Sequence, residues 1–442
     1  MGRMDHEWVI QERLAARVPK LICDFKSDRR EKYPKHLGMP VRNGTVRVLY
    51  SFPHKLGAAR ICTTAWYQVK GIAAAGAEVT VYTGSICREV PKSVRVRTTL
   101  AWNKLRLPYR LLGSRRSCAL HDWLVAQKLK KLAGQVDVVH VWPLAALRTI
   151  QVAKQLGIPT VLERPNAHTR FAYEIVQKEC SRLGVSMPSN HEHAYNSAVL
   201  EHEESEYKST DYLLCPSDFV ARTFRAEGFP PEKLVRHQYG FDREFYYPAP
   251  GTPELNRGLT VLFAGGCAPR KGLHYALDAW LKSSACQKGT FLVAGKFIPG
   301  YAELLANQLN HPSVKVLGHR NDLPHLMRRS DVLVLPSLEE GSALATYEAR
   351  GCGCVLLVSN ASGAVCNDPE NALVHTVGDV RSLTRHLNLL HEDRGLLKKM
   401  RAASLATAGE ITWEAAGVRL LQVYQETIGN RMGGKRQVTG EH

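Results

Sequence analysis

The stretch that decides the fold is DVLVLPSLEEGSALATYEARGCGCVLLVS, residues 331–359. An apolar run stops at Pro336, a short acidic loop follows, and a second apolar run begins at Val355 after a segment with helical spacing. This order predicts a strand, a loop, a helix and a second, parallel strand. Glu340 in the loop and Glu348 in the helix stand eight residues apart, so both can face a ligand at the N-terminus of the helix.

Alternating apolar runs and helix-like segments continue on both sides of this unit. One series occupies residues 46–242 and a second begins at residue 259, with a passage rich in tyrosine and proline between them at 246–251. A chain of 442 residues is also longer than one ordinary hydrophobic core supports. The sequence therefore predicts an α/β protein made of two doubly wound, Rossmann-like domains that face each other across a cleft.

The chain divides into five expected segments. The first has no clean hydrophobic period, the fourth has the spacing of an amphipathic helix, and the last is polar, which is typical of a disordered tail. The segments are an N-terminal extension (1–44), the first Rossmann-like domain (45–243), the second (244–411), a C-terminal helix (412–429) and the tail (430–442).

Composition favours a globular protein of the cytoplasm. Hydrophobic residues make up 44% and charged residues 23% of the chain, and no apolar run approaches the roughly 20 residues that span a bilayer. The N-terminal sequence is too polar for a secretory signal. The eleven cysteines are scattered and include no CxxC pair, so we interpret them as free thiols in a reducing compartment.

A net charge of +18 favours an anionic partner, either phosphorylated substrates or an anionic membrane surface, although a solvated basic surface is an equal alternative. Nucleic acid is not expected, because no recognisable nucleic-acid-binding module is present. Residues 99–134 are basic and carry Trp102 and Trp123, so this segment can either contact a membrane face peripherally or form an ordinary surface helix.

Two turns have the features of phosphate-binding loops. The first, at 54–60, follows the first strand and contains Gly57, which alone is a weak signal. The second, GGCAPRKGL at 265–273, combines two glycines with Arg270 and Lys271 at the start of a helix. Cations beside free backbone N–H groups predict a diphosphate site, with a surface basic pair as the alternative.

Two stretches of the sequence contain histidines at positions where a catalytic or metal site is conceivable. His168 follows the end of a strand in RPNAHT (164–169), where α/β sheets place their sites, and is a candidate for this reason. The segment NHEHAYNSAVLEHEESE at 190–206 invites a metal site, but it has no HExxH spacing and its first two histidines are two residues apart. We therefore interpret it as a polar helix and expect no metal.

Several motifs together resemble those of a known family. EGSALATYEARGCG at 340–353 is similar to the Glu-x7-Glu signature of retaining glycosyltransferase family 4, whose members have the GT-B fold. Supporting motifs follow in the family's order across about residues 45–428: DVVH (137–140), the His168 segment, YGFD (239–242), RKG (270–272), VLG and DLP within 316–324, and DVLVLPS (331–337).

The resemblance implies a metal-independent, retaining transferase. It would move a sugar from a nucleotide-diphosphate sugar to a hydroxyl of a saccharide, lipid-linked or small-molecule acceptor. The donor is a substrate, so no cofactor is expected. The alternatives are a nucleotide-sugar hydrolase or epimerase, a sugar-phosphate synthase of the same fold, and a non-catalytic nucleotide-sugar-binding protein. A dinucleotide oxidoreductase is disfavoured because GxGxxG followed by an acidic residue is absent.

The resemblance also implies roles for residues of the second domain. Arg270 and Lys271 would bind the donor diphosphate, and Glu348 would accept hydrogen bonds from the ribose hydroxyls. Glu340 would hold the transferred sugar together with the backbone of four consecutive residues, Gly341, Ser342, Ala343 and Leu344. The residues expected to flank the base are His319 and Arg320.

The remaining implied roles concern the first domain and the turn after residue 264. His168 would lie beside the reaction centre as a catalytic residue with Arg270, Lys271 and Glu340, while Gly57 would approach the phosphates. Gly265 would let the backbone come close to them. The next residue is a departure: the family commonly has Gly-Arg, and here Gly266 follows Gly265. Arg270 is then expected to compensate for the missing cation.

Overall fold

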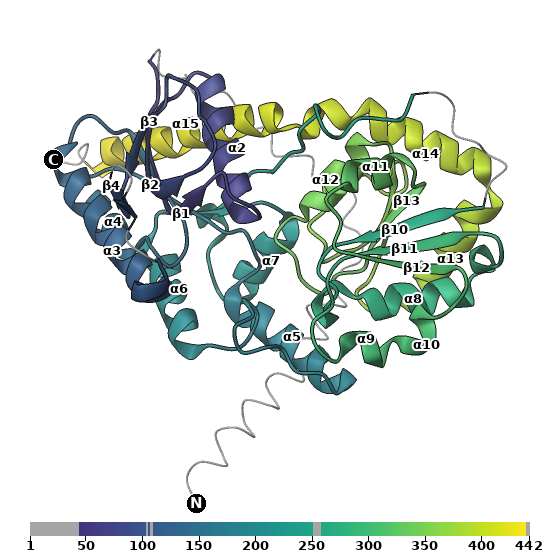
Figure 1. Ribbon diagram of the computed structural model, residues 1–442. Helices are drawn as coiled ribbons and strands as arrows, with labels where there is room; N and C mark the ends of the chain where they lie inside the picture. The colour runs from purple at the N-terminus through teal and green to yellow at the C-terminus, as the bar shows by residue number, and fades with distance from the viewer. Residues whose placement is uncertain (1–43, 103–104, 107–108, 251–257, 439–442) are drawn as a thin grey trace, which may run out of the picture.

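The computed structural model describes residues 44–102, 105–106, 109–250 and 258–438. Most of the expected N-terminal extension and the end of the expected tail therefore lie outside the described residues. The described chain forms two α/β domains, each built on a parallel sheet (Figure 1). The predicted architecture of two doubly wound, Rossmann-like domains is confirmed.

The first domain contains a seven-stranded sheet in the order β3-β2-β1-β6-β7-β8-β9. Its strands are β1 (Arg47–Leu56), β2 (Glu78–Ile86), β3 (Arg95–Thr98), β6 (Val138–Val141), β7 (Thr160–Glu163), β8 (Tyr212–Cys215) and β9 (Leu234–Arg236), and β4 (Ala101–Trp102) pairs separately with β5 (Leu105–Arg106). The helices are α2 (Ile61–Ala74), α3 (Tyr109–Lys131), α4 (Leu147–Gln155), α5 (Thr169–Leu183), α6 (Ser197–Ser209) and α7 (Asp218–Ala226), with a 3-10 turn η1 (Pro231–Lys233).

The second domain contains a six-stranded sheet in the order β12-β11-β10-β13-β14-β15. Its strands are β10 (Thr260–Ala264), β11 (Thr290–Ala294), β12 (Val314–Gly318), β13 (Val332–Leu335), β14 (Val355–Ser359) and β15 (Ala372–His375). Its helices are α8 (Leu273–Lys282), α9 (Tyr301–Leu304), α10 (Ala306–Leu309), α11 (Leu323–Arg328), α12 (Leu344–Gly351), α13 (Val380–Glu392) and α14 (Arg394–Ala406), with 3-10 turns η2 (Pro269–Lys271), η3 (Ser284–Gln287) and η4 (Ala408–Ile411).

The unit predicted from residues 331–359 is present as β13, α12 and β14. The two strands pair in parallel, with Val332 opposite Val355, and every residue of both strands is buried. A parallel strand covered by helices on both faces has this continuous apolar character. The loop at 336–343 therefore opens at the carboxyl end of β13, next to the turn that follows β10.

The C-terminal helix α15 (Trp413–Val438) lies along α2 in the first domain (Figure 1). Gly71 and Gly417 allow this close approach, because a Cβ added at Gly417 would lie 2.4 Å from the carbonyl carbon of Gly71. Trp413 stacks on Tyr67 with ring centroids 4.8 Å apart. The helix continues beyond residue 429, where a disordered tail was expected, because no proline interrupts its backbone hydrogen bonding there.

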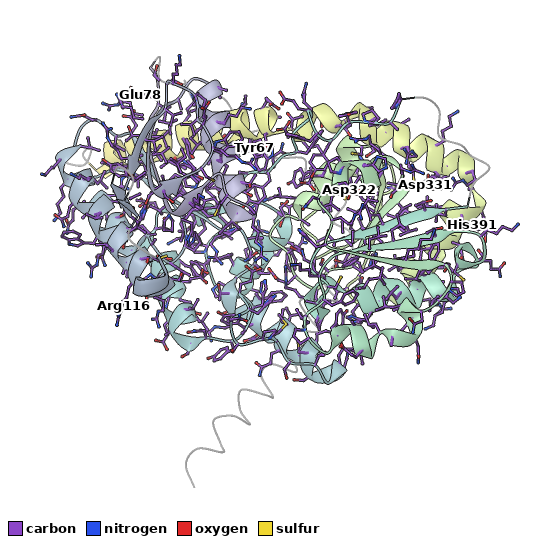
Figure 2. The ribbon with its side chains drawn as sticks, in the orientation of Figure 1. Tyr67, Glu78, Arg116, Asp322, Asp331 and His391 are labelled. Carbon is purple, nitrogen blue, oxygen red and sulfur yellow. The ribbon has the colours of Figure 1, made fainter. Side chains whose placement is uncertain are left out.

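Helix α3 carries most of the described part of the basic segment 99–134. Its inner face is fixed to the first domain by Asp122, whose carboxylate accepts hydrogen bonds from the backbone N–H groups of Arg148 and Thr149 at the start of α4, at 2.8 and 2.9 Å. The outer face exposes Trp123 and five cations, Arg115, Arg116, Lys128, Lys130 and Lys131. Arg116 is labelled in Figure 2 at the edge of the domain. Within the described parts of the chain, no helix is long and apolar enough to cross a membrane.

Candidate functional site

A cluster of two cations and two carboxylates lies where the second sheet opens towards the first domain. The turn after β10 passes through Gly265, whose φ of +152° favours glycine, and then through η2, which presents Arg270 and Lys271. The loop after β13 presents Glu339 and Glu340, which are 0% and 6% exposed. Strands β10 and β13 are neighbours in the sheet, so their following loops meet at one edge.

Direct contacts hold these four side chains together, and we call them the charge cluster. Arg270 Nη1 donates to the carbonyl oxygen of Glu339 at 2.7 Å and lies 3.2 Å from Glu339 Oε2 and 3.3 Å from Glu340 Oε2. Lys271 Nζ forms an ion pair with Glu340 Oε1. The structure thus brings together three residues that the sequence placed in one site and adds Glu339, which sequence reasoning missed.

The charges in the cluster depend on one another. Burial would raise the pKa of Glu340, but Arg270 and Lys271 together outweigh burial and hold that pKa below its usual range. Burial lowers the pKa of Lys271, and Glu340 opposes this effect. The pKa of Glu339 is raised by burial despite the nearby Arg270. An anionic ligand that bound the two cations would replace the carboxylates as their partners.

Glu348 lies on α12 and has a different environment. Burial raises its pKa to about 7, and a hydrogen bond with Tyr246 acts in the opposite direction. Tyr246 belongs to the passage between the domains.

The backbone around the start of α12 is positioned by Ser342. The Oγ of Ser342 donates to the carbonyl oxygen of Gly363 at 2.8 Å and lies 2.7 Å from the hydroxyl of Tyr347.

The first domain touches the loop before α12 directly. The backbone N–H of Ala167 donates to Glu339 Oε1 at 3.0 Å, and Ser217 Oγ donates to the carbonyl oxygen of Gly341. A Cβ added at Gly341 would lie 1.7 Å from the carbonyl oxygen of Pro165, so only glycine fits there. In the sequence, the only indication that Glu339 belongs to the site is that it precedes Glu340. Adjacent positions do not show which of the two carboxylates faces the first domain.

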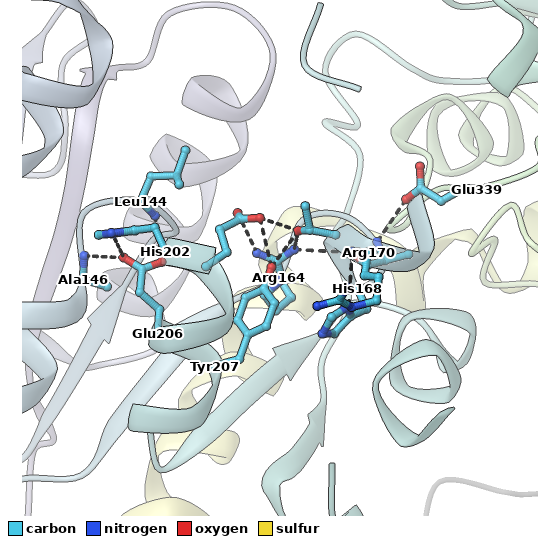
Figure 3. Close-up of polar contacts among 12 residues, drawn as sticks. Leu144, Ala146, Arg164, His168, Arg170, His202, Glu206, Tyr207 and Glu339 are labelled. Atoms are coloured by element: carbon cyan, nitrogen blue, oxygen red, sulfur yellow. Dashed lines mark hydrogen bonds and ion pairs between the residues drawn. The ribbon is translucent and has the colours of Figure 1, made fainter. Parts of the chain in front are cut away.

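His168 lies at the start of α5 and contributes to the packing of the first domain, and its position beside a reaction centre stays a prediction. It is the N-cap residue of α5, and its Nδ1 accepts a hydrogen bond from the backbone N–H of Arg170 at 3.3 Å. The ring packs in a first-domain aromatic cluster, with centroids 4.9, 5.2 and 5.8 Å from those of Phe224, Tyr207 and Phe229. Figure 3 shows His168 beside Arg164 and Tyr207, with Glu339 approaching the same segment through the backbone.

The electrostatics of His168 agree with this placement. The residue is 1% exposed, and burial, followed by the charge of Arg164, lowers the pKa of its imidazole to about 3. Arg164 is itself buried and donates to Glu203 at 3.1 Å, with its guanidinium 4.4 Å from the ring centroid of Tyr207 (Figure 3). A neutral, packed imidazole that caps a helix serves the structure of the first domain.

The segment at 190–206 is only partly helical, which corrects the expectation of a polar helix. Residues 190–196 form turns, and α6 begins at Ser197 because Asn196 caps it by accepting a hydrogen bond from the N–H of Val199 at 3.1 Å. His193 lies in the turn region and is 5% exposed. Among the residues that the structure describes, no group of three or more histidine, cysteine or carboxylate side chains is placed to hold a metal ion.

The other predicted residues lie on loops other than the two that form the charge cluster. Gly57 has a φ of +83°, and a Cβ there would lie 2.7 Å from the Cβ of Arg88. His319 and Arg320 are exposed after β12. Arg320 pairs with Asp322 at 2.6 Å, and both line a cavity of about 840 Å³ that extends to Thr260 at the start of β10. Contacts of these residues with phosphates or a base stay predictions.

Two family models match successive parts of the chain. The model described as Glycosyltransferase Family 4 matches residues 63–245, in the first domain, and the model described as Glycosyl transferases group 1 matches residues 258–393, in the second. Together they cover the two Rossmann-like domains on which the charge cluster is built.

Two curated relatives that match parts of the chain have the names of glycosyltransferases. A Campylobacter jejuni protein, N,N'-diacetylbacillosaminyl-diphospho-undecaprenol alpha-1,3-N-acetylgalactosaminyltransferase, is 29% identical over 124 residues, which are 28% of this chain and 33% of that protein. An Escherichia coli protein, UDP-Gal:alpha-D-GlcNAc-diphosphoundecaprenol alpha-1,3-galactosyltransferase, is 39% identical over 84 residues, which are 18% of this chain and 21% of that protein. The matches thus span a third or less of these two relatives.

Solved structures share the fold. The Anabaena protein Alr3699/HepE, crystallised with UDP, superposes with a TM-score of 0.60 at 17% identity, covering 86% of this chain and 100% of that one. A likeness at this level of identity establishes the arrangement of two facing Rossmann-like domains. With both domains matched by family models and the architecture shared with solved relatives, the chain belongs to the GT-B glycosyltransferases of the family 4 type.

Proposed function

We propose that the protein transfers a sugar from a nucleotide-diphosphate sugar to a hydroxyl of a saccharide or lipid-linked acceptor. The observation that carries this proposal is the charge cluster, in which buried Arg270 and partly buried Lys271 form ion pairs with the carboxylates of Glu339 and Glu340. Cations that can exchange an internal carboxylate for a ligand anion suit the diphosphate of such a donor.

The chemistry needs a stabilised leaving group. The bond between the anomeric carbon and the β-phosphate oxygen breaks as the acceptor oxygen bonds to that carbon, and negative charge grows on the departing diphosphate. Arg270 and Lys271 would balance this charge, and one such preorganised contact supplies about 3 kcal/mol of transition-state stabilisation. Glu340, once released from Lys271, would be available to accept hydrogen bonds from hydroxyls of the transferred sugar.

We further propose that the transfer retains the anomeric configuration and does not require a metal. The acceptor would attack on the face from which the diphosphate leaves, and its proton would pass to the leaving phosphate oxygen. The two cations would supply the positive charge that a metal ion provides in other transferases. Gly341 and Ala167 bring the domains into contact at the same point, which would exclude water from the reacting groups.

A lipid-linked saccharide is the acceptor class that we favour. The Campylobacter jejuni and Escherichia coli relatives both have undecaprenol diphosphate in their names. The exposed face of α3, with Trp123 beside Arg115 and Arg116, has the chemistry for peripheral contact with anionic lipid headgroups. We propose that this face holds the protein near such an acceptor.

A binding screen followed by product analysis tests the proposal. Thermal unfolding is measured with nucleoside diphosphates and nucleotide sugars, and the donor that stabilises the protein most is then incubated with and without saccharide and lipid-linked acceptors. We expect a raised Tm and a product that requires the acceptor. Absence of stabilisation by every nucleoside diphosphate would overturn the proposal, and rapid donor breakdown without any acceptor would favour a hydrolase.

A further inference from the structure

The segment between α5 and α6 contacts both domains. Leu183 and Val185 pack against the core of the second domain, while Met187 packs with Leu338 and first-domain side chains. Val185 also lies close to Gly300, where an added Cβ would be 3.4 Å from its Cγ1. These contacts bring the chain that enters the following turns, residues 190–196, to the boundary between the two domains.

His193 is the buried side chain of these turns, and its ring is held by its neighbours. The backbone N–H of His193 donates to Nδ1 of His191 at 3.2 Å, and the two ring centroids are 5.6 Å apart. Nε2 of His193 is buried and has no hydrogen-bond partner among the residues that the structure describes, and it lies 3.7 Å from Glu192 Oε1. An orphaned polar atom inside a protein is unusual and indicates a missing partner.

The ring lies within the electrostatic reach of the charge cluster. Burial lowers the pKa of His193 well below its usual value, and Arg270, His191 and Lys271 lower it further. Arg270 and Lys271 therefore act on His193 from the second domain, although His193 belongs to the first. The imidazole is neutral at pH 7, so it carries one N–H donor and one acceptor nitrogen.

We infer that His193 is a donor-binding residue, whose Nε2 hydrogen-bonds the diphosphate of the nucleotide sugar held by Arg270 and Lys271. The inference rests on the proposed function, because it requires a diphosphate at the two cations. An Nε2–H group aimed at an anionic oxygen would satisfy the buried atom and add a first-domain contact to a ligand otherwise held by the second domain. The ligand would then join the domains across the cluster.

The test compares His193→Ala and His193→Gln with the wild-type protein by calorimetric titration of UDP or GDP, whichever stabilises the wild type, and of the corresponding nucleoside. His193→Ala is expected to weaken diphosphate binding about tenfold, the size of one hydrogen bond to a charged group, and to leave nucleoside binding unchanged. His193→Gln keeps an N–H donor near the same position and should recover part of the loss. Asn190→Ala, an exposed position in the same turns, is the matched control and should bind as the wild type does.

The outcomes separate the inference from the function on which it rests. A wild-type protein that binds no nucleoside diphosphate would refute the proposed function itself. Wild-type binding with equal diphosphate affinity in His193→Ala would overturn only the role of His193. An equal loss of nucleoside and diphosphate affinity would also overturn the role of His193, because misfolding of the turns at 190–196 would weaken the binding of both ligands. The ratio of the two affinities keeps the test valid even where a variant has a lower Tm.

Discussion

At the scale of single residues, the site depends on carboxylates that neutralise cations until a ligand arrives. Glu340 pairs with both Arg270 and Lys271, while Glu339 pairs with Arg270 and accepts a hydrogen bond from the first domain. A buried ion pair costs desolvation energy that its own attraction barely repays. A diphosphate can therefore replace the carboxylates as the partner of the two cations. The cations are already largely removed from water, so binding the diphosphate adds little desolvation cost on their side.

Replacing Lys271 by Ala is expected to lower kcat/KM for sugar transfer by about 10²–10³-fold, because the charge that balances the leaving diphosphate is lost. Steady-state kinetics with the identified donor measures this effect. Lys282→Ala is the control, since Lys282 is an exposed cation of the adjoining helix α8 that pairs with Asp278 at 2.9 Å. Equal kinetics in Lys271→Ala and Lys282→Ala would contradict a role of Lys271 in catalysis.

Glu348 should make stability depend on pH. Its pKa is raised by burial from an ordinary value of 4.5 to about 7, so the folded protein holds this proton more tightly than the unfolded chain. The stability it contributes is complete below about pH 4.5 and is lost as the pH rises through about 7. Glu348→Gln stays neutral, so its free energy of unfolding relative to the wild type should increase between pH 5 and 8, by up to about 3 kcal/mol.

Urea unfolding of both proteins at pH 5 and pH 8 measures this difference. Glu414→Gln, at an exposed carboxylate on α15, controls for the loss of a surface charge and should follow the wild-type profile. Parallel pH profiles for Glu348→Gln and the wild type would show that Glu348 ionises normally in the folded protein.

Some of the residues of the charge cluster could be predicted from the sequence. Arg270, Lys271 and Glu340 could be placed together because they follow the ends of strands that the apolar runs made recognisable. The direction of the His168 ring could not be predicted, since it depends on helix capping and on aromatic rings such as that of Tyr207, which is distant in the sequence. Side-chain direction is a tertiary property that spacing does not encode.

At the scale of elements, the pattern of apolar residues predicted secondary structure better than polar composition did. The strand–helix–strand order of residues 331–359 is confirmed because two continuous apolar runs allow few other structures. The polar composition of the segment at 190–206 predicts one helix, yet its first residues form turns. Asn196 competes for the backbone as an N-cap, and the apolar contacts of Val185 and Met187 draw the preceding chain between the domains.

Helix α3 is the element that we expect to govern membrane contact. Replacing Arg115 and Arg116 together by Ser should weaken binding to vesicles containing anionic phospholipid by at least about tenfold, since each cation near such a surface contributes about 1 kcal/mol. Co-sedimentation with anionic and zwitterionic vesicles measures this loss. The double replacement of Lys398 and Lys399 by Ser removes the same charge from α14 and is the control. Equal weakening by both pairs would point to net charge rather than to α3.

At the scale of the whole molecule, the two domains pack so closely at Gly341 that no side chain fits between them. A Cβ there would overlap the carbonyl oxygen of Pro165, so Gly341→Ala should force the domains apart and cost at least about 2 kcal/mol of their contact. Small-angle X-ray scattering should then show a larger radius of gyration. Gly266→Ala is the control, because an added Cβ at Gly266 has nothing within 4 Å. Identical scattering from both variants would contradict this tight contact.

The path of the chain through the two domains has a consequence for how the protein is made. Leu420, Val423 and Tyr424 of α15 belong to the buried core of the first domain, and the hydroxyl of Tyr424 lies 2.7 Å from Nδ1 of His140. On the ribosome, the first domain emerges early but lacks this helix until the whole second domain has been translated. Its apolar surface along α2 stays uncovered for that time, so early release or a shortened C-terminus would leave a nascent chain that depends on chaperones.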